Sequence, residues 1–262
     1  NTVSNIQARL QKEVFKMILI GTSGYSFQDW KGHFYPEDIK NHEMLDFYAR
    51  HFNAVEINST YYRMPETLMF DRMVEKTPEN FEFVVKANKA MTHEREDNTA
   101  VFDKFKEGIR PLSDANRFSG LLAQFPWSFR NTQSNRTYLA QFKDKIGDYP
   151  LIVEFRHNSW IIEPIFDLLR RLNISYCAVD EPRLNGLVPP IAVATNNLGY
   201  VRFHGRNAES WWEGDSSKRY DYLYTQQELF EWLPKIETIE NSTDKTFVFF
   251  NNCQDLLLVF YS

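Results

Sequence analysis

Acidic, basic and imidazole side chains follow short apolar runs at five well-separated points of this chain, namely Glu56, Lys86, Glu154, Asp180 and His204. Carboxylate, amine and imidazole groups exchange protons with a bound molecule when burial or a neighbouring charge brings their pKa near neutrality. Histidine titrates in that range without any shift. We therefore predict that these five residues carry general acid/base catalysis.

A second set of residues is suited to holding a ligand. Arginine pairs well with a carboxylate or a phosphate, while amides and hydroxyls donate and accept hydrogen bonds. Two aromatic residues in the loop after the first apolar run offer ring faces to a sugar, a nucleobase or another flat ligand, whereas packing explains most other aromatic residues of the chain. The residues expected to bind the substrate are Ser23, Tyr25, Trp30, Asn58, Gln124, Arg156, Arg202, Asn251 and Asn252.

Structural roles are the alternative for the charged pairs. Glu154 with Arg156, and Asp180 with Arg202, could form ion pairs that only close one end of the fold. Each pair of residues two positions apart faces one side of a strand, because the side-chain period of a strand is two. Both interpretations therefore place Glu154 and Arg156 together.

Lys86 and His204 likewise have a structural and a functional interpretation. Lys86 could extend its amine outward into solvent. Its position at the end of the apolar run Phe83–Val85 favours instead a partly apolar site, where it could transfer a proton or bind an anion. His204 could be a hydrogen-bonded core residue, whereas the adjacent Gly205 would let the backbone approach a ligand closely.

A divalent metal is weakly indicated. Glu56, Glu154 and Asp180, together with His204, are ligand types that hold Mn, Mg or Zn. The same set of strand ends also carries cations, at Lys86, Arg156 and Arg202, which would repel a metal unless each is paired. We therefore expect no cofactor; if a metal binds, its ligands are Glu56, Glu154 and Asp180.

The elements that position these residues are eight short β-type runs separated by stretches of helical spacing, for example residues 43–52 and 165–172. Alternation of strand and helix predicts parallel strands with helical crossovers. The expected strands are residues 18–20, 55–57, 81–85, 120–125, 151–155, 175–179, 200–203 and 246–250.

The repeat length narrows the architecture to a single-domain (β/α)8 barrel of the TIM type. Polar residues that end the strands recur at intervals of about 33 residues between Ser23 and Asn251, close to the ~30 residues of one βαβ unit. A doubly wound open sheet is the alternative, but no G-x-G-x-x-G loop follows the first strand. In a barrel the polar strand ends meet at the carboxyl-terminal mouth, where active sites of this fold are built.

Composition excludes several classes of protein. The chain has 262 residues, of which 43% are hydrophobic and 16% aromatic, and a net charge of −5. These values exclude disordered and fibrous proteins, and they make nucleic acid an unlikely partner. No apolar run is long enough to span a membrane. The cysteines, Cys177 and Cys253, cannot form a disulfide framework, which indicates a reducing compartment and predicts a cytoplasmic protein.

Several segments together resemble the YecE-like family, a domain of unknown function also called DUF72. They include residues 21–25 (GTSGY), 56–62 (EINSTYY), 124–126 (QFP), 154–157 (EFRH) and 202–206 (RFHGR). The resemblance runs from about Met17 to Asn252. It implies a TIM-type barrel and supplies no activity. The recurring polar positions that it implies coincide with the strand-end residues above and add His93.

The chain departs from that family at both ends. Residues 1–16 precede the usual start at Met17 and form an expected extension, with the barrel over residues 17–262. After Asn252 the sequence differs from the glycine- and alanine-containing stretch with which the family opens a last helix. The last helix is therefore expected to be short, displaced or missing.

These observations favour an enzyme that acts on a small anionic or sugar-like substrate, which could be phosphorylated. Glu154 or Asp180 would be the base, and Lys86 or His204 the acid or electrophilic stabiliser. Arginine side chains at the mouth would hold a phosphate or carboxylate. The alternatives are a ligand-binding barrel without chemistry and, by fold analogy, a metal-dependent isomerase or an endonuclease-like phosphoesterase.

Overall fold

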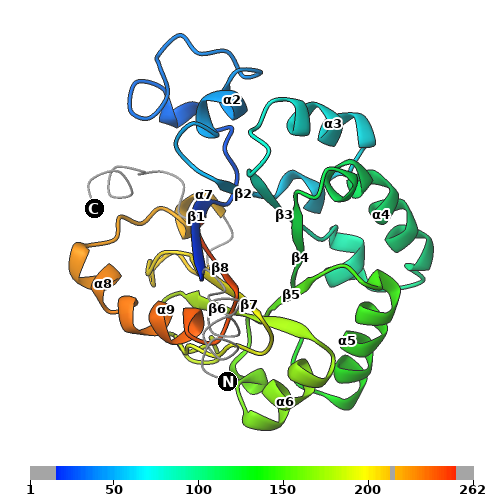
Figure 1. The fold of residues 1–262 in the computed structure, drawn as a ribbon. Helices are drawn as coiled ribbons and strands as arrows, with labels where there is room; N and C mark the ends of the chain where they lie inside the picture. Colours follow the sequence, from blue (N-terminus) through cyan, green and yellow to red (C-terminus); the bar gives the residue numbers. More distant parts are fainter. Residues whose placement is uncertain (1–15, 213–215, 252–262) are drawn as a thin grey trace, which may run out of the picture.

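Eight parallel strands alternate with helices around a central axis (Figure 1). The computed structural model describes residues 16–212 and 216–251. All eight strands expected from the sequence are confirmed, and the fold is a TIM-type (β/α)8 barrel. The strands are β1 (Met17–Thr22), β2 (Ala54–Ile57), β3 (Glu82–Lys86), β4 (Phe118–Gln124), β5 (Leu151–Glu154), β6 (Ile174–Asp180), β7 (Leu198–Phe203) and β8 (Lys245–Phe250).

Helices surround the strands: α3 to α6 lie on one side of the barrel, and α8 and α9 lie on the other (Figure 1). Pro164 is the second residue of α6, within the first turn, where its missing N–H costs no helical hydrogen bond. The described helices are α2 (Met44–Tyr48), α3 (Thr67–Glu75), α4 (Thr99–Asp114), α5 (Gln133–Ile146), α6 (Glu163–Arg171), α7 (Ser216–Arg219), α8 (Gln226–Phe230) and α9 (Leu233–Glu240), with the short turns η1 (Gln28–Trp30), η2 (Ser59–Tyr61), η3 (Ala90–Glu94) and η4 (Asn158–Trp160).

The barrel closes between β1 and β2 through a short seam. An isolated bridge joins Ser23 to Glu56. The Tyr48 hydroxyl spans the seam, accepting from the Thr22 amide at 2.9 Å and donating to the Ala54 carbonyl at 3.1 Å. Gly21 allows this approach, because a Cβ there would lie 2.3 Å from the Ala54 oxygen. A side chain thus replaces part of the ladder that joins the other neighbouring strands.

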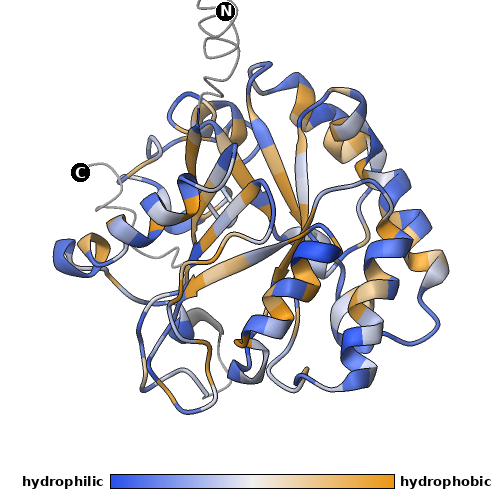
Figure 2. Ribbon diagram, turned by 60° about the horizontal axis from the view of Figure 1, so that its bottom comes forward, coloured by the Kyte–Doolittle hydropathy of each residue, from blue (hydrophilic) through white to orange (hydrophobic). Residues whose placement is uncertain are grey.

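The amino-terminal end of the barrel is closed by a charged contact between β3 and β8. Lys245 Nζ lies 2.6 Å from both carboxylate oxygens of Glu82, and the Ser119 hydroxyl donates to the same carboxylate. Between this contact and the opposite end, hydrophobic residues line the strands (Figure 2) and form one continuous core. The carboxyl-terminal end is therefore left for polar side chains.

Some expectations concern segments beyond the described residues. Except for Lys16, the expected extension over residues 1–16 lies outside them, as do Asn252 and the expected altered last helix. Among the helices that are described, none combines the length and the apolar character that crossing a membrane requires.

Candidate functional site at the barrel mouth

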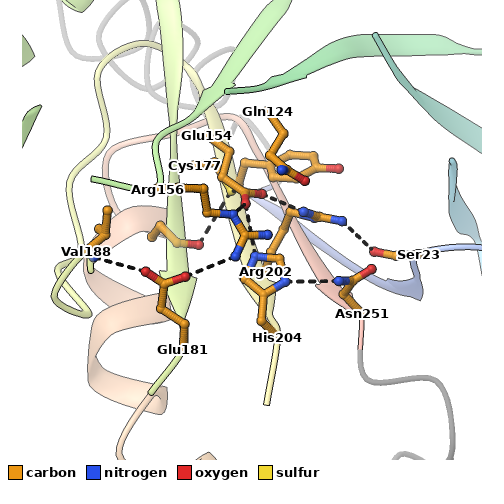
Figure 3. Close-up of polar contacts among 12 residues, drawn as sticks. Ser23, Gln124, Glu154, Arg156, Cys177, Glu181, Val188, Arg202, His204 and Asn251 are labelled. Atoms are coloured by element: carbon orange, nitrogen blue, oxygen red, sulfur yellow. Dashed lines mark hydrogen bonds and ion pairs between the residues drawn. The ribbon is translucent and has the colours of Figure 1, made fainter. Parts of the chain in front are cut away.

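A buried charged cluster forms the floor of the mouth, with Arg202 of β7 at its centre (Figure 3). Its Nη2 lies 2.7 Å from Oε1 of Glu56, and its Nη1 lies 2.5 Å from Oε2 of Glu154. Nη2 also donates to the Ser23 hydroxyl at 3.2 Å. All three charged groups are 0% exposed. Arg202 is thus neutralised by β2 and β5, and the expectation that it holds a substrate phosphate is not supported.

Arg156 extends the cluster to a carboxylate that the sequence analysis missed. Its Nε lies 2.7 Å from Oε1 of Glu154, and its Nη1 donates to Glu181 at 3.1 Å. Glu181 also accepts from the Val188 amide at 3.0 Å. Burial raises the pKa of Glu181 to about 7, although Arg156 opposes that shift. Glu181 lies four residues after Cys177, which faces Glu154. Because the side-chain period of a strand is two, this spacing was the sequence signal that Glu181 shares the inward face.

His204 is held in one protonation state by the same cluster. Its Nε2 lies 3.1 Å from Oε1 of Glu154, and its Nδ1 lies 3.1 Å from the Asn251 amide nitrogen. Burial, followed by Arg156, lowers the pKa of His204 to about 3, so the ring is neutral. The neutral ring therefore donates from Nε2 to Glu154 and accepts at Nδ1 from Asn251, as the hydrogen-bond network requires.

Glu154 is ionised at the centre of these contacts. Burial opposes its charge, but Arg156, Arg202 and His204 hold the pKa of Glu154 well below its ordinary value. Both Glu154 and His204 are 0% exposed and fully engaged. The structure thus places them under the mouth as fixed partners, which does not favour the predicted roles of base and acid in contact with a substrate.

Asp180 lies on the opposite face of its strand from the cluster, which corrects the prediction that it shares the mouth. Because Cys177 Sγ faces Glu154, Asp180 three positions later points out toward the helices. It accepts two hydrogen bonds from Arg206, at 2.8 Å each, and others from Tyr224 and Trp232. Its ion-pair partner is Arg206, not Arg202.

Two expectations about the loops are also corrected. Trp30 is 2% exposed, and its ring packs on Phe27 and Tyr35 at centroid distances of 4.7 Å and 5.8 Å. It therefore supports the loop after β1 and does not face a ligand. Gly205 has φ of 86°, and a Cβ there would lie 2.6 Å from Tyr222, so a side chain takes the place expected for a ligand.

A cavity of about 880 Å³ opens above the charged cluster. Amides, hydroxyls and aromatic rings dominate its lining. Of the predicted site residues it brings together Ser23, Tyr25, Asn58, Lys86, His93, Gln124 and Asn251, and it adds Ser59, Tyr61, Tyr62, Arg219 and Tyr220 among others.

Lys86 enters this cavity from the end of β3. Its Nζ donates to Oε1 of Gln124 at 2.8 Å and lies 4.9 Å from the centroid of the Tyr61 ring. Burial, followed by the nearby Arg202, lowers the pKa of Lys86 to about 8. Within the part of the chain that the structure describes, no carboxylate forms an ion pair with this amine. Lys86 therefore exchanges protons close to physiological pH.

His93 lies beside Lys86 as a neutral imidazole. Its ring packs edge-on against Tyr61 at 5.1 Å, and its Nδ1 lies 2.9 Å from the Thr92 hydroxyl. Burial, followed by Lys86, lowers the pKa of His93 to about 4. The imidazole stays neutral when it relays a proton, because it takes a proton on one ring nitrogen as it gives one up from the other.

The three residues expected to bind a metal if one is present, Glu56, Glu154 and Asp180, do not converge on one point. Glu56 and Glu154 flank Arg202, while Asp180 faces the helices. Over residues 16–212 and 216–251 no group of three or more His, Cys, Asp or Glu side chains is arranged to hold a metal ion.

Similarity to known proteins agrees with this architecture. A family profile described as "Protein of unknown function DUF72" matches residues 19–256. The chain belongs to the DUF72 family. It is 34% identical over 253 residues to the UPF0759 protein YunF of Bacillus subtilis, covering 90% of this chain and 89% of YunF.

Solved DUF72 structures have the same fold. A DUF72 family protein from Thermotoga maritima shares 40% sequence identity, with a TM-score of 0.84 over 91% of this chain and 93% of that protein. A second, from Enterococcus faecalis, shares 28% identity, with a TM-score of 0.82 over 91% and 90% of the two chains. These relatives establish no activity or substrate for the DUF72 family.

Proposed function

We propose that this DUF72 protein is an enzyme that binds a small polyhydroxylated or anionic substrate in the mouth cavity and transfers protons through Lys86. The observation that carries this proposal is the lining of the cavity. Amides, hydroxyls and aromatic faces, together with the charged Asp29 and Arg219, line the cavity around Lys86, whose hydrogen-bond partner, Gln124, is uncharged. Such a lining suits hydroxyl-rich ligands, whose polar edges form hydrogen bonds while their ring faces pack on aromatic side chains.

Asn58 supports binding of a hydroxyl group. It lines the cavity, and its Oδ1 is buried without a hydrogen-bond partner among the described residues. Buried polar atoms in proteins are nearly always paired, and leaving one unpaired costs about 1–3 kcal/mol. A ligand hydroxyl donating to Asn58 would remove that cost. Tyr25, Tyr61 and Tyr220 supply aromatic surface around the same space.

An anionic group on the substrate would be held by Lys86 and Arg219. Arg219 lines the cavity, with its guanidinium 5.8 Å from the centroid of the Trp211 ring. This replaces the sequence-based expectation for Arg156 and Arg202, whose guanidinium groups face Glu154, Glu56 and Glu181. The anion site therefore lies above the cluster and not within it.

Lys86 would act as the general acid or base. A catalytic group works best when its pKa lies near the working pH, and the pKa of Lys86 is lowered to about 8. The buried cluster below contributes through charge, because Arg202 and Arg156 disfavour the ammonium form while Glu154 and Glu56 favour it. In this proposal Glu154 and Glu56 position the arginines and do not touch the substrate.

The test is turnover on a panel of aldoses, ketoses, sugar phosphates and phosphoesters, followed by NMR. We expect product formation with at least one member, and loss of kcat of about 100-fold or more in Lys86→Ala. Lys89→Ala, which removes an exposed lysine three residues away, is the matched control and should retain activity. Binding without any product would indicate a ligand-binding barrel, and unchanged kcat in Lys86→Ala would refute the role of this lysine.

A further inference from the structure

Lys86 has surroundings that leave its amine available as a nucleophile. The two carboxylates whose charges act on it, Glu56 and Glu154, form ion pairs with Arg202, and Glu154 also pairs with Arg156. Among the described residues, Lys86 Nζ donates its hydrogen bond to the neutral amide oxygen of Gln124. A carboxylate partner would stabilise the ammonium ion, which has no lone pair, whereas an amide acceptor also tolerates the neutral amine.

The same lysine is held on a rigid support and faces open space. It ends β3, which pairs with β2 on one side and β4 on the other, and the preceding Val85 is fully buried. Its Nζ lies against the Tyr61 ring on one side and Gln124 on another, and the cavity of about 880 Å³ provides the remaining approach. A small carbonyl compound can therefore reach Nζ without any movement of the strand.

From this geometry we infer that Lys86 forms an imine with the carbonyl carbon of a small polyhydroxylated aldehyde or ketone. This inference rests on the proposed function, because it uses the same cavity, and it specifies the substrate class and the chemical step. The lowered pKa of Lys86 adds support, since an appreciable fraction of the amine is neutral near pH 7.5.

The step is a condensation that releases water. The lone pair of neutral Nζ attacks the carbonyl carbon, and the carbonyl oxygen takes one of the two amine protons to give a carbinolamine. The C–O bond then breaks, the second amine proton leaves with the hydroxyl as water, and a C=N bond remains. No oxidant or reductant takes part. Tyr61 and neutral His93, which line the cavity beside Lys86, are placed to carry these protons.

Reductive trapping tests this inference on the full chain. Dihydroxyacetone and sodium cyanoborohydride are added at pH 7.5, and the protein is analysed by intact mass and peptide mapping at short times. We expect an adduct of the probe less one oxygen atom on Lys86, formed on the order of 10–100-fold faster than on exposed lysines because more of this amine is neutral. Lys89, which is 50% exposed and paired with Glu94, provides the internal comparison.

The outcomes separate this inference from the proposed function. Adducts on surface lysines with Lys86 unmodified would overturn the imine. This experiment uses the unaltered protein, so its result does not depend on whether a variant folds. If Lys86→Arg, which preserves charge but cannot form an imine, retains turnover on the substrate panel, the imine is also wrong while an enzyme remains. Rapid trapping on Lys86 with no turnover on any panel member supports the imine and counts against the proposed reaction.

Discussion

At the scale of single residues, Lys86 combines a position in the mouth cavity with a cost in stability. The folded protein lowers its pKa to about 8 from an ordinary value of 10.5, so the ammonium form is less stable in the fold than in the unfolded chain. A group of this kind reduces stability most below pH 8, and the reduction disappears as pH rises toward 10.5. Such a destabilised lysine is typical of a functional site.

Lys86→Met is therefore expected to stabilise the protein. At pH 7 the free energy of unfolding should rise by about 1 kcal/mol, because the substitution removes an unfavourably placed charge. The gain should shrink when the same comparison is made at pH 10. Thermal and urea denaturation at both pH values measure the effect, with Lys89→Met as the surface control. A stability loss at pH 7 that persists at pH 10 would show that Lys86 has a mainly structural role.

Glu154, in contrast to Lys86, is expected to stabilise the fold, because its carboxylate contacts three buried partners, Arg156, Arg202 and His204. Glu154→Gln retains the shape of the side chain but leaves Arg156 and Arg202 without its charge. We expect the free energy of unfolding to fall by about 3–5 kcal/mol, as is typical when one member of a buried ion-pair network is removed. Glu94→Gln, in an exposed ion pair with Lys89, should change it by less than about 1 kcal/mol. Equal small effects would mean that the cluster is not a buried network in solution.

At the scale of elements, the seam between β1 and β2 is the weakest joint of the barrel. One bridge and the Tyr48 hydroxyl join these strands, whereas β1 and β8 pair along six residues. Ser23 and Glu56, which form the bridge, are also members of the charged cluster around Arg202. The seam and the floor of the site are thus stabilised together.

Tyr48→Phe removes the hydroxyl that spans this seam. The Thr22 amide and the Ala54 carbonyl would each lose a buried partner, so we expect a loss of about 1–2 kcal/mol in the free energy of unfolding. Hydrogen exchange should become faster for the amide of Thr22, with smaller changes in β5 and β6. Tyr62→Phe, at a side chain with 73% exposure, serves as the control. Uniform acceleration over all strands would instead indicate global destabilisation.

Asp180 acts at the same scale by fastening the segment after β7 to β6. Its carboxylate receives hydrogen bonds from Arg206, Tyr224 and Trp232, which follow β7 in the chain. Tyr224 also accepts a hydrogen bond from the Gly205 amide at 2.8 Å. A residue first expected in the mouth therefore holds in place the chain that follows His204.

At the scale of the whole molecule, buried groups with shifted pKa values determine how stability depends on pH. His204 has a folded pKa of about 3, below its ordinary 6.5, so its contribution to stability is lost as pH falls below 6.5. Glu181 has a folded pKa of about 7, above its ordinary 4.5, so its contribution is present below pH 4.5 and is lost as pH rises through 7. Between pH 4.5 and 6.5 these two groups oppose each other.

Glu181→Gln is expected to make stability rise more steeply with pH across that interval, by up to about 1.4 kcal/mol per pH unit. The groups that face Glu181 are Arg156 and Glu154, and both remain in the variant. His204→Gln should change the slope in the other direction, because it removes the opposing titration. Urea denaturation between pH 4.5 and 7 measures both slopes. A parallel displacement of the curves, with no change in slope, would contradict the pKa directions assigned here.

The sequence alone determined the barrel and the end of it at which polar groups gather. Eight β-type runs at intervals of about 33 residues leave few topologies, and the carboxyl ends of parallel strands meet at one mouth whatever the details of packing. Strand periodicity also placed Glu154 with Arg156 on one face. These conclusions depend on local spacing, which is present in the sequence.

Only the tertiary structure decided which polar residues line the mouth cavity. Asp180 and Glu181 are adjacent, yet one faces the helices and the other Arg156, and this depends on which face of β6 points inward. Trp30 and Tyr25 lie in one loop, but only Tyr25 lines the cavity. Arg202 lies below Lys86 because carboxylates from β2 and β5 reach it there. Burial and ion pairing arise from contacts between segments far apart in the chain, so spacing along the sequence could not reveal them.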